Sequence, residues 1–255
     1  MNISCMINSK KKINYILILS CLLFAVFVRA YNIDYDDLWF DEISSFWVSD
    51  PEISFQESLK RHKNIEKTPF LYFSILKINF NLFSYDAATG RNLSLIFNIL
   101  GIIFSTLICK ILKNNNAYIL SLFIFSTNIF LINYSQELRV YSLVFLLSSI
   151  YLFLFIKINK FYKSRQLNFL YLFFISLILI LMLLSHPFCF IIFFSTSLFL
   201  FLEFINKKDI SKTLVYNFYI GLIFSSFILF FLINKVGSSP NWIIQPDIKF
   251  YTNFY

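Results

Sequence analysis

Long apolar runs recur along the chain and are separated by short polar stretches. Uncharged runs long enough to cross a hydrocarbon core of about 30 Å occupy residues 13–28, 92–109, 117–135, 140–156 and 214–234. A longer run over 166–202 holds Ser185, His186 and Pro187 near its middle, where a turn satisfies the backbone better than a continuous helix. Dividing that run into two spans predicts an all-α polytopic membrane protein with about seven transmembrane helices.

Composition and charge agree with this pattern. Of 255 residues, 58% are hydrophobic and only 14% charged, which is too apolar for a soluble domain of this size. The formal net charge of +8 comes from cations spread over short loops between the spans, which is typical of membrane orientation. We therefore expect membrane lipid, and no nucleic acid, among the partners. The four cysteines lie in the spans or the amino-terminal tail, so no disulfide framework is predicted.

The apolar segment 70–83 decides the topology. It has 14 residues with Lys77 at its centre, so its length and charge argue against a crossing. If it does not cross, the amino terminus is cytoplasmic and twelve cations collect on the cytoplasmic side; if it does, nine of them move outside, against the positive-inside tendency. We therefore predict that 70–83 lies along the outer interface. The twelve are Lys10, Lys11, Lys12, Lys110, Lys113, Lys157, Lys160, Lys163, Arg165, Lys207, Lys208 and Lys212.

The acidic residues follow the same partition. Ten of the fourteen lie between residues 34 and 86, which makes 31–90 one large outer loop with a polar helix near 51–62 and a juxtamembrane apolar helix from Pro69. We treat 1–255 as a single transmembrane domain: the outer loop 31–90, helices two to seven over 91–234, and the start of a later outer loop over 235–255. The ten acids are Asp34, Asp36, Asp37, Asp41, Glu42, Asp50, Glu52, Glu57, Glu66 and Asp86.

Three distant segments are thereby predicted to share the outer face: Asp41 and Glu42, the stretch 134–141, and the turn 185–187. Adjacent carboxylates between aromatic residues at a bilayer surface suggest proton chemistry there. The simpler alternative is that Asp41 caps the next helix, with Glu42 in its first turn. We further predict that Glu137 and Arg139 open a spanning helix, with Tyr141 on the same helix face as Glu137.

Four short elements follow one another along the chain: Trp39–Glu42, Thr68–Tyr72, Arg91–Ser94 and Ser135–Tyr141. In this order they resemble elements of the GT-C-fold membrane glycosyltransferases, in particular the group of protein O-mannosyltransferases and aminoarabinose transferases. The Asp-Glu pair after the first span looks like that family's pair, and an Arg with a following Ser begins the second span. One departure is Thr68, which stands where the family has Pro, and the chain looks like the amino-terminal half of such an enzyme.

The resemblance implies an inverting glycosyltransferase at the outer face of the bacterial inner membrane. It would move a sugar from a polyprenyl-phosphate donor to a glycan, lipid or protein acceptor. The residues themselves disfavour a soluble sugar nucleotide as donor, because the chain has only four glycines and no glycine-rich loop that could cradle a diphosphate. A lipid-linked donor needs a base for the acceptor hydroxyl and cations for the departing phosphate.

The resemblance assigns Asp41 as the catalytic carboxylate, and Glu42 and Glu137 are further catalytic candidates. For a divalent metal, Asp41, Glu42 and Glu137 are the candidate ligands, although no spacing requires one; no cofactor is otherwise implied. Arg139 is the first phosphate candidate, because a cation at a helix amino terminus needs an anionic partner, and either a phosphate or Glu137 could supply it. The remaining candidates for substrate contact are Lys67, Tyr141, His186 and Arg91.

Each of these assignments has a structural alternative. Lys67 would equally reach lipid headgroups, Arg91 would pair with an acid of the outer loop, and His186 would bond to backbone. A transporter or lipid flippase is the main rival class, although such proteins place ionisable groups near mid-membrane. An O-antigen polymerase or ligase would carry its largest outer loop late in the chain, and a purely structural membrane subunit is the remaining alternative.

Overall fold

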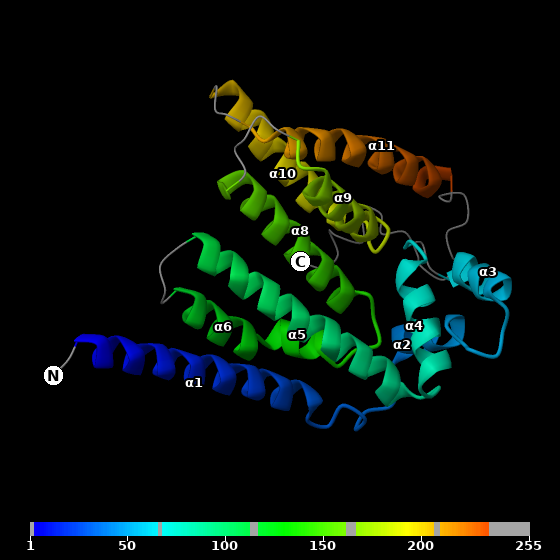
Figure 1. Ribbon diagram of the computed structural model, residues 1–255. Coiled ribbons are helices and arrows are strands. Elements are labelled where there is room, and N and C mark those ends of the chain that lie inside the picture. Colours follow the sequence, from blue (N-terminus) through cyan, green and yellow to red (C-terminus); the bar gives the residue numbers. More distant parts are fainter. Residues whose placement is uncertain (1–2, 66–67, 113–116, 162–166, 207–209, 235–255) are drawn as a thin grey trace, which may run out of the picture.

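The computed structural model describes residues 3–65, 68–112, 117–161, 167–206 and 210–234, and all their regular secondary structure is helical (Figure 1). The helices are α1 (Ile3–Ala30), α2 (Phe40–Val48), α3 (Phe55–Ile65), α4 (Leu71–Leu82), α5 (Ala87–Leu112), α6 (Ala117–Thr127), α7 (Ile129–Ser135), α8 (Tyr141–Phe161), α9 (Phe169–Leu183), α10 (Cys189–Ile205) and α11 (Lys212–Asn234).

The long helices form a bundle with three short helices gathered at one end. Helices α1, α6, α5 and α8 lie side by side, and α9, α10 and α11 follow beyond α8 (Figure 1). Helix α5 packs against α8, α6, α7 and α1, which makes it the centre of the first group, and α9 joins α8 to α11. The short helices α2, α3 and α4 occupy the end at which α5 begins (Figure 1).

Every predicted span falls on a helix, but not all of them are long enough to cross on their own. Helices α1, α5 and α8 are long and apolar enough to cross a membrane, and the bent pair α6–α7 makes a fourth candidate. Helices α9 and α10 have 15 and 17 residues, or about 23 and 26 Å at 1.5 Å per residue, which is less than a core of about 30 Å. The described residues therefore contain three helices, or four with the bent pair, that are both long and apolar enough to cross, which makes the chain a helical membrane protein.

The predicted continuous span over 117–135 is wrong in one respect, because the helix bends by 57° between α6 and α7. The Asn128 side chain accepts the Leu131 backbone N–H at 3.0 Å and starts a new helix. Arg29 of α1 donates to the carbonyls of Phe125 and Ser126, both at 3.0 Å. The bend exposes carbonyls at the end of α6, and the buried guanidinium satisfies them.

The predicted turn between 166 and 202 is confirmed. Helix α9 ends at Leu183 and α10 begins at Cys189. The Cys189 N–H donates to the His186 carbonyl at 3.0 Å, so the short connection reverses the chain with its backbone partly satisfied. This turn delivers His186 to the same end of the bundle as α2–α4.

The loop 31–90, which we predicted to lie on the outer side, holds the two helices that its pattern predicts. Polar α3 overlaps the range 51–62, and apolar α4 lies within 70–83. The Lys77 side chain at the centre of α4 donates to the carbonyls of Asp50 and Ile53. A lysine in an apolar helix therefore closes the loop before α3, while Tyr72, Leu76 and Phe80 of the same helix are buried.

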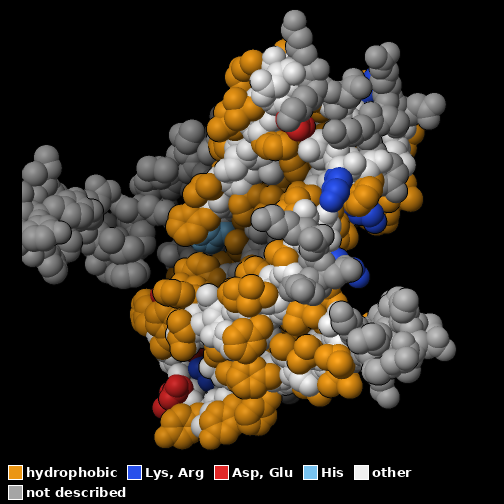
Figure 2. All heavy atoms as spheres, turned by 90° about the vertical axis from the view of Figure 1, so that its left-hand side faces the viewer, with side chains coloured by type: hydrophobic (Ala, Val, Ile, Leu, Met, Phe, Trp, Pro, Cys, Tyr) orange, Lys and Arg blue, Asp and Glu red, His pale blue; other side chains and the backbone are white. Residues whose placement is uncertain are grey.

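Much of the outer surface of the bundle is apolar. The side chains of Leu23 and Phe27 on α1 are 62% and 65% exposed, and hydrophobic side chains cover much of the face drawn in Figure 2. Such a surface is stable in hydrocarbon and would be costly in water. The segment 235–255, predicted to begin a later outer loop, lies outside the described residues.

Candidate functional site

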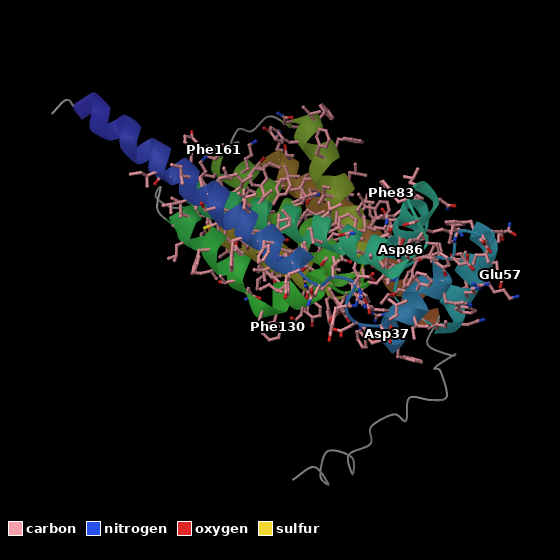
Figure 3. All side chains as sticks on the ribbon, turned by 90° about the horizontal axis from the view of Figure 1, so that it is seen from below. Asp37, Glu57, Phe83, Asp86, Phe130 and Phe161 are labelled. Carbon is pink, nitrogen blue, oxygen red and sulfur yellow. The ribbon has the colours of Figure 1, made fainter. Side chains whose placement is uncertain are left out.

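Three segments that are far apart in sequence meet at the end of the bundle that carries α2–α4. They are the start of α2, the connection 136–140 between α7 and α8, and the turn 184–188 between α9 and α10. Asp37, Glu57 and Asp86 lie at this end, and Phe161 lies away from it (Figure 3). The predicted clustering of acidic residues on one face is therefore present in the fold.

Glu42 and Arg91 form a buried ion pair at the centre of this end. Arg91 Nε donates to Glu42 Oε1 at 3.0 Å and Nη2 donates to Oε2 at 2.7 Å, and the two residues are only 4% and 1% exposed. Glu42 Oε1 also accepts the Leu138 N–H at 2.7 Å. This bidentate contact joins α2, α5 and the α7–α8 connection, so Arg91 has the structural partner that the sequence offered as an alternative.

The Arg91 guanidinium also binds backbone carbonyls within residues 33–37, the first part of the loop 31–90. Its Nη1 donates to the carbonyls of Ile33 at 3.1 Å and Asp36 at 2.8 Å, and Nη2 reaches the Asp37 carbonyl at 3.3 Å. A planar guanidinium has five N–H donors, so one side of it can bind a carboxylate while the other binds backbone carbonyls. The pair Glu42–Arg91 is therefore a rigid frame that holds four chain segments together.

Asp41 points away from this frame and meets Arg139. The Asp41 carboxylate is 38% exposed and the Arg139 side chain 13%, with 3.5 Å between Asp41 Oδ2 and Arg139 Nη2. Arg139 Nη1 also donates to the Asp41 backbone carbonyl at 3.1 Å. The alternative that Asp41 caps α2 is wrong, because Trp39 occupies the cap position and its N–H donates to Glu42 Oε2 at 3.4 Å.

Arg139 lines a small cleft with residues of α2, α4 and both connections. Its volume is about 10 Å³, enough for about one water molecule. The buried Tyr72 hydroxyl makes no hydrogen bond of normal geometry to the described residues; burial raises the pKa of its phenol, and the nearby Ser94 hydroxyl opposes that shift. A buried, unsatisfied hydroxyl is costly unless something else binds it. The lining residues are Ser45, Thr68, Tyr72, Phe73, Arg139, Val140, Tyr141 and His186.

Aromatic rings form one wall of the cleft. The Tyr141 ring lies 4.8 Å from that of Tyr134 and 6.0 Å from that of His186, and the Arg139 guanidinium lies 6.0 Å from the Tyr141 ring. His186 Nδ1 accepts the Phe188 N–H at 3.1 Å, so its backbone alternative is realised as well. Burial lowers the pKa of His186, and the Arg139 charge lowers it further, which favours the neutral imidazole.

Glu137 lies beside the same group of charges. It is half-buried, and burial together with the nearby Glu42 carboxylate raises the pKa of Glu137, while the Arg139 charge opposes that shift. Our expectation that Glu137 and Arg139 open a helix is wrong, since residues 136–140 form a bent connection and α8 begins at Tyr141. The chain must reverse between α7 and α8, and a helix over these residues would prevent that.

Seven of the eight candidate residues thus lie at one end of the bundle, and Lys67 lies outside the described residues. Sequence reasoning missed Ser45 and the isolated Tyr72 hydroxyl, which only the packing of α2 against α4 brings to the cleft. It also missed Arg29. A cation within an apolar helix is costly unless it has partners, so the position of Arg29 in an apolar run could have indicated that it binds other segments. Among the described residues, no three His, Cys, Asp or Glu side chains gather as metal ligands would.

Comparison with known proteins gives no assignment: no protein-family model, curated protein or solved structure matches this chain.

Proposed function

We propose that this protein is a membrane glycosyltransferase of the GT-C type, with seven spans and its site at the outer face of the bacterial inner membrane. It transfers a sugar from a polyprenyl-phosphate donor to a glycan, lipid or protein acceptor, with inversion at the anomeric carbon. The proposal extends the resemblance of the four sequence elements, each of which contributes residues to the site described above.

One observation carries most of this proposal. A partly exposed carboxylate, Asp41, is in contact with a largely buried cation, Arg139, and Arg139 in turn lines a small cleft together with Tyr72. This supplies a proton acceptor and an anion-binding group side by side, at one end of an apolar bundle. A lipid-linked substrate presents its hydroxyl and phosphate at that depth, where the bilayer meets water.

The chemistry then needs little else. The acceptor hydroxyl gives its proton to Asp41 as its oxygen bonds to the anomeric carbon, and the bond from that carbon to the phosphate oxygen breaks. Both electrons of the broken bond leave with the polyprenyl phosphate. The new negative charge on that phosphate is stabilised by Arg139, with Tyr72 as a further donor.

The present conformation is closed, because a cleft of about 10 Å³ cannot admit a sugar phosphate. Arg139 must leave the Asp41 carboxylate to bind a phosphate, which frees Asp41 for the acceptor. The geometry supports this exchange, because the 3.5 Å contact between the two side chains is long for an ion pair and its Asp41 side is open to solvent. Glu42 and Arg91 are positioning residues in this proposal, since their mutual contacts already use their polar atoms.

The orientation fits the same proposal. Lys110, Lys157 and Lys160 lie near the ends of α5 and α8 that are remote from the site, and such cations favour the cytoplasmic side. The site end then faces outward. A transporter would instead be expected to hold ionisable side chains near the middle of its helices, and no observation on the described residues favours that alternative.

The proposal is tested by a transfer assay in membranes with radiolabelled polyprenyl-phosphate sugars. Asp41→Asn keeps the shape and removes the base, so we expect transfer to fall at least about 100-fold at equal protein level. Asp37→Asn is the matched control, because its side chain is an exposed acid of the same loop. Equal transfer by wild-type protein and Asp41→Asn would reject the assignment, and movement of intact donor across the membrane would support a flippase instead.

A further inference from the structure

A second, much larger cavity lies at the opposite end of the bundle. It is a groove between α8 and α10 with a volume of about 670 Å³, within the range of about 300–1,000 Å³ that is usual for ligand sites. Lys160 at its rim is about 28 Å along the α8 axis from Tyr141 of the candidate site. The groove is lined by Leu112, Leu152, Phe155, Ile156, Asn159, Lys160, Ile192, Ser195, Thr196 and Phe199.

The walls of this groove are suited to hydrocarbon. Its two hydroxyl-bearing wall residues are satisfied within their own helix: Ser195 donates to the Ile191 carbonyl at 2.7 Å and Thr196 to the Ile192 carbonyl at 3.0 Å. Both hydroxyl groups therefore already use their hydrogen atoms and do not require a polar ligand in the groove. The outer surface of α10 beside the groove exposes Ile191 and Phe194, so the groove lies in the apolar part of the bundle surface, where lipid tails are the surrounding medium.

The rim of the groove is positively charged. Lys160 is exposed and its ammonium donates to the Ile111 carbonyl; an ammonium has three donors, so it can also bind an anion. The Asn159 amide lies beside Lys160 in the lining. None of the described lining residues is acidic. The charge of this rim is complementary to a phosphate at the membrane surface.

We propose that this groove is a binding site for an anionic phospholipid of the leaflet on the lysine-rich side of the membrane. One acyl chain lies between α8 and α10, and the phosphate contacts Lys160 and Asn159. The site is independent of the proposed transferase site, since it uses none of the same residues and faces the other side of the bilayer. Its occupant is a lipid that stays bound, not a lipid that reacts.

Native mass spectrometry of the delipidated, detergent-solubilised full chain tests the proposal. Phosphatidylglycerol and phosphatidylcholine with identical acyl chains are added separately, and we expect one tightly bound phosphatidylglycerol. Lys160→Gln should weaken phosphatidylglycerol binding about fivefold and leave phosphatidylcholine binding unchanged. Lys60→Gln is the matched control, because Lys60 is 73% exposed on α3 at the opposite end, and it should bind phosphatidylglycerol as the wild type does.

A second variant tests the groove itself. Ser195→Trp fills the cavity from the exposed face of α10, so core packing is retained, and it should reduce binding of both lipids; Ser195→Ala should not. Equal affinity of the wild type for the two lipids, or phosphatidylglycerol binding that Lys160→Gln leaves unchanged, would overturn the proposal. Retention of bound lipid by Ser195→Trp would show a merely annular association and would overturn it as well.

Discussion

Replacement of Glu42 by Gln is the sharpest test of how the site is held together. The substitution keeps the size of the side chain but leaves the Arg91 guanidinium buried without a counter-charge, in a place where only 4% of the residue is exposed. Breaking a buried ion pair from one side costs about 3–5 kcal/mol. Gln retains one acceptor oxygen for Arg91 or the Leu138 N–H, so we expect about 3 kcal/mol. For a chain of this size that corresponds to a fall of roughly 6–12 °C in Tm.

The assay is a thermal unfolding curve of the detergent-purified protein, followed by fluorescence-detected size exclusion. Asp37→Asn removes a carboxylate from the same loop without touching the pair, and its Tm should stay within about 2 °C of the wild type. The double variant Glu42→Leu with Arg91→Met should be less destabilised than the sum of the two single variants, because it leaves no unpaired charge. If Glu42→Gln has the same Tm as the wild type, the Glu42–Arg91 pair does not hold these chain segments together.

Two further predictions concern neighbours of this frame. An Ala side chain at Gly90 would place its Cβ 2.2 Å from Leu138 Cδ1 and 2.8 Å from Leu138 Cγ. Leu138 is fully buried, so its shift must displace neighbouring side chains; Gly90→Ala should therefore cost about 1–3 kcal/mol in the same thermal assay, and an unchanged Tm would contradict the close packing. The pKa of Glu137 is raised by burial, so the folded state binds its proton more tightly than the unfolded state does and stability should fall as pH rises through the folded pKa. Glu137→Gln should remove that part of the pH dependence; an identical pH profile of Tm would show that the carboxyl is solvated instead.

The positions of the long helices could be predicted from the sequence, because apolar runs in a membrane protein have few alternative structures. The turn at His186 and the short helices of the outer loop were predictable for the same reason, from polar residues that interrupt an apolar pattern. The bend between α6 and α7 was not. It depends on Asn128 as a cap and on Arg29, which reaches across from α1, and no local pattern connects these two residues. The lengths of α9 and α10 leave the number of crossings a prediction.

The residues of the candidate site were predictable as types and as members of one group, but not as partners. Charge counting places Glu42, Arg91 and Arg139 at one end, and it cannot say which acid meets which cation. The pairing follows from the packing of α2 against the starts of α5 and α8, which is a tertiary property. Tyr72 shows the same limit, since its hydroxyl matters only because the packing of α4 buries it without a described partner.

The two adjacent carboxylates have different environments for a geometric reason. Successive residues of an α-helix point about 100° apart, so when α2 directs Glu42 into the bundle it must direct Asp41 sideways along the cleft. The Asp41 carbonyl accepts from Ser44, Ser45 and Arg139, which fixes its backbone, while its carboxylate stays 38% exposed. A fixed main chain with an accessible carboxylate suits the proton acceptor that we propose. The buried pair beneath Asp41 is therefore the cause of its position, and loss of the pair should displace the acid even though every atom of Asp41 is retained.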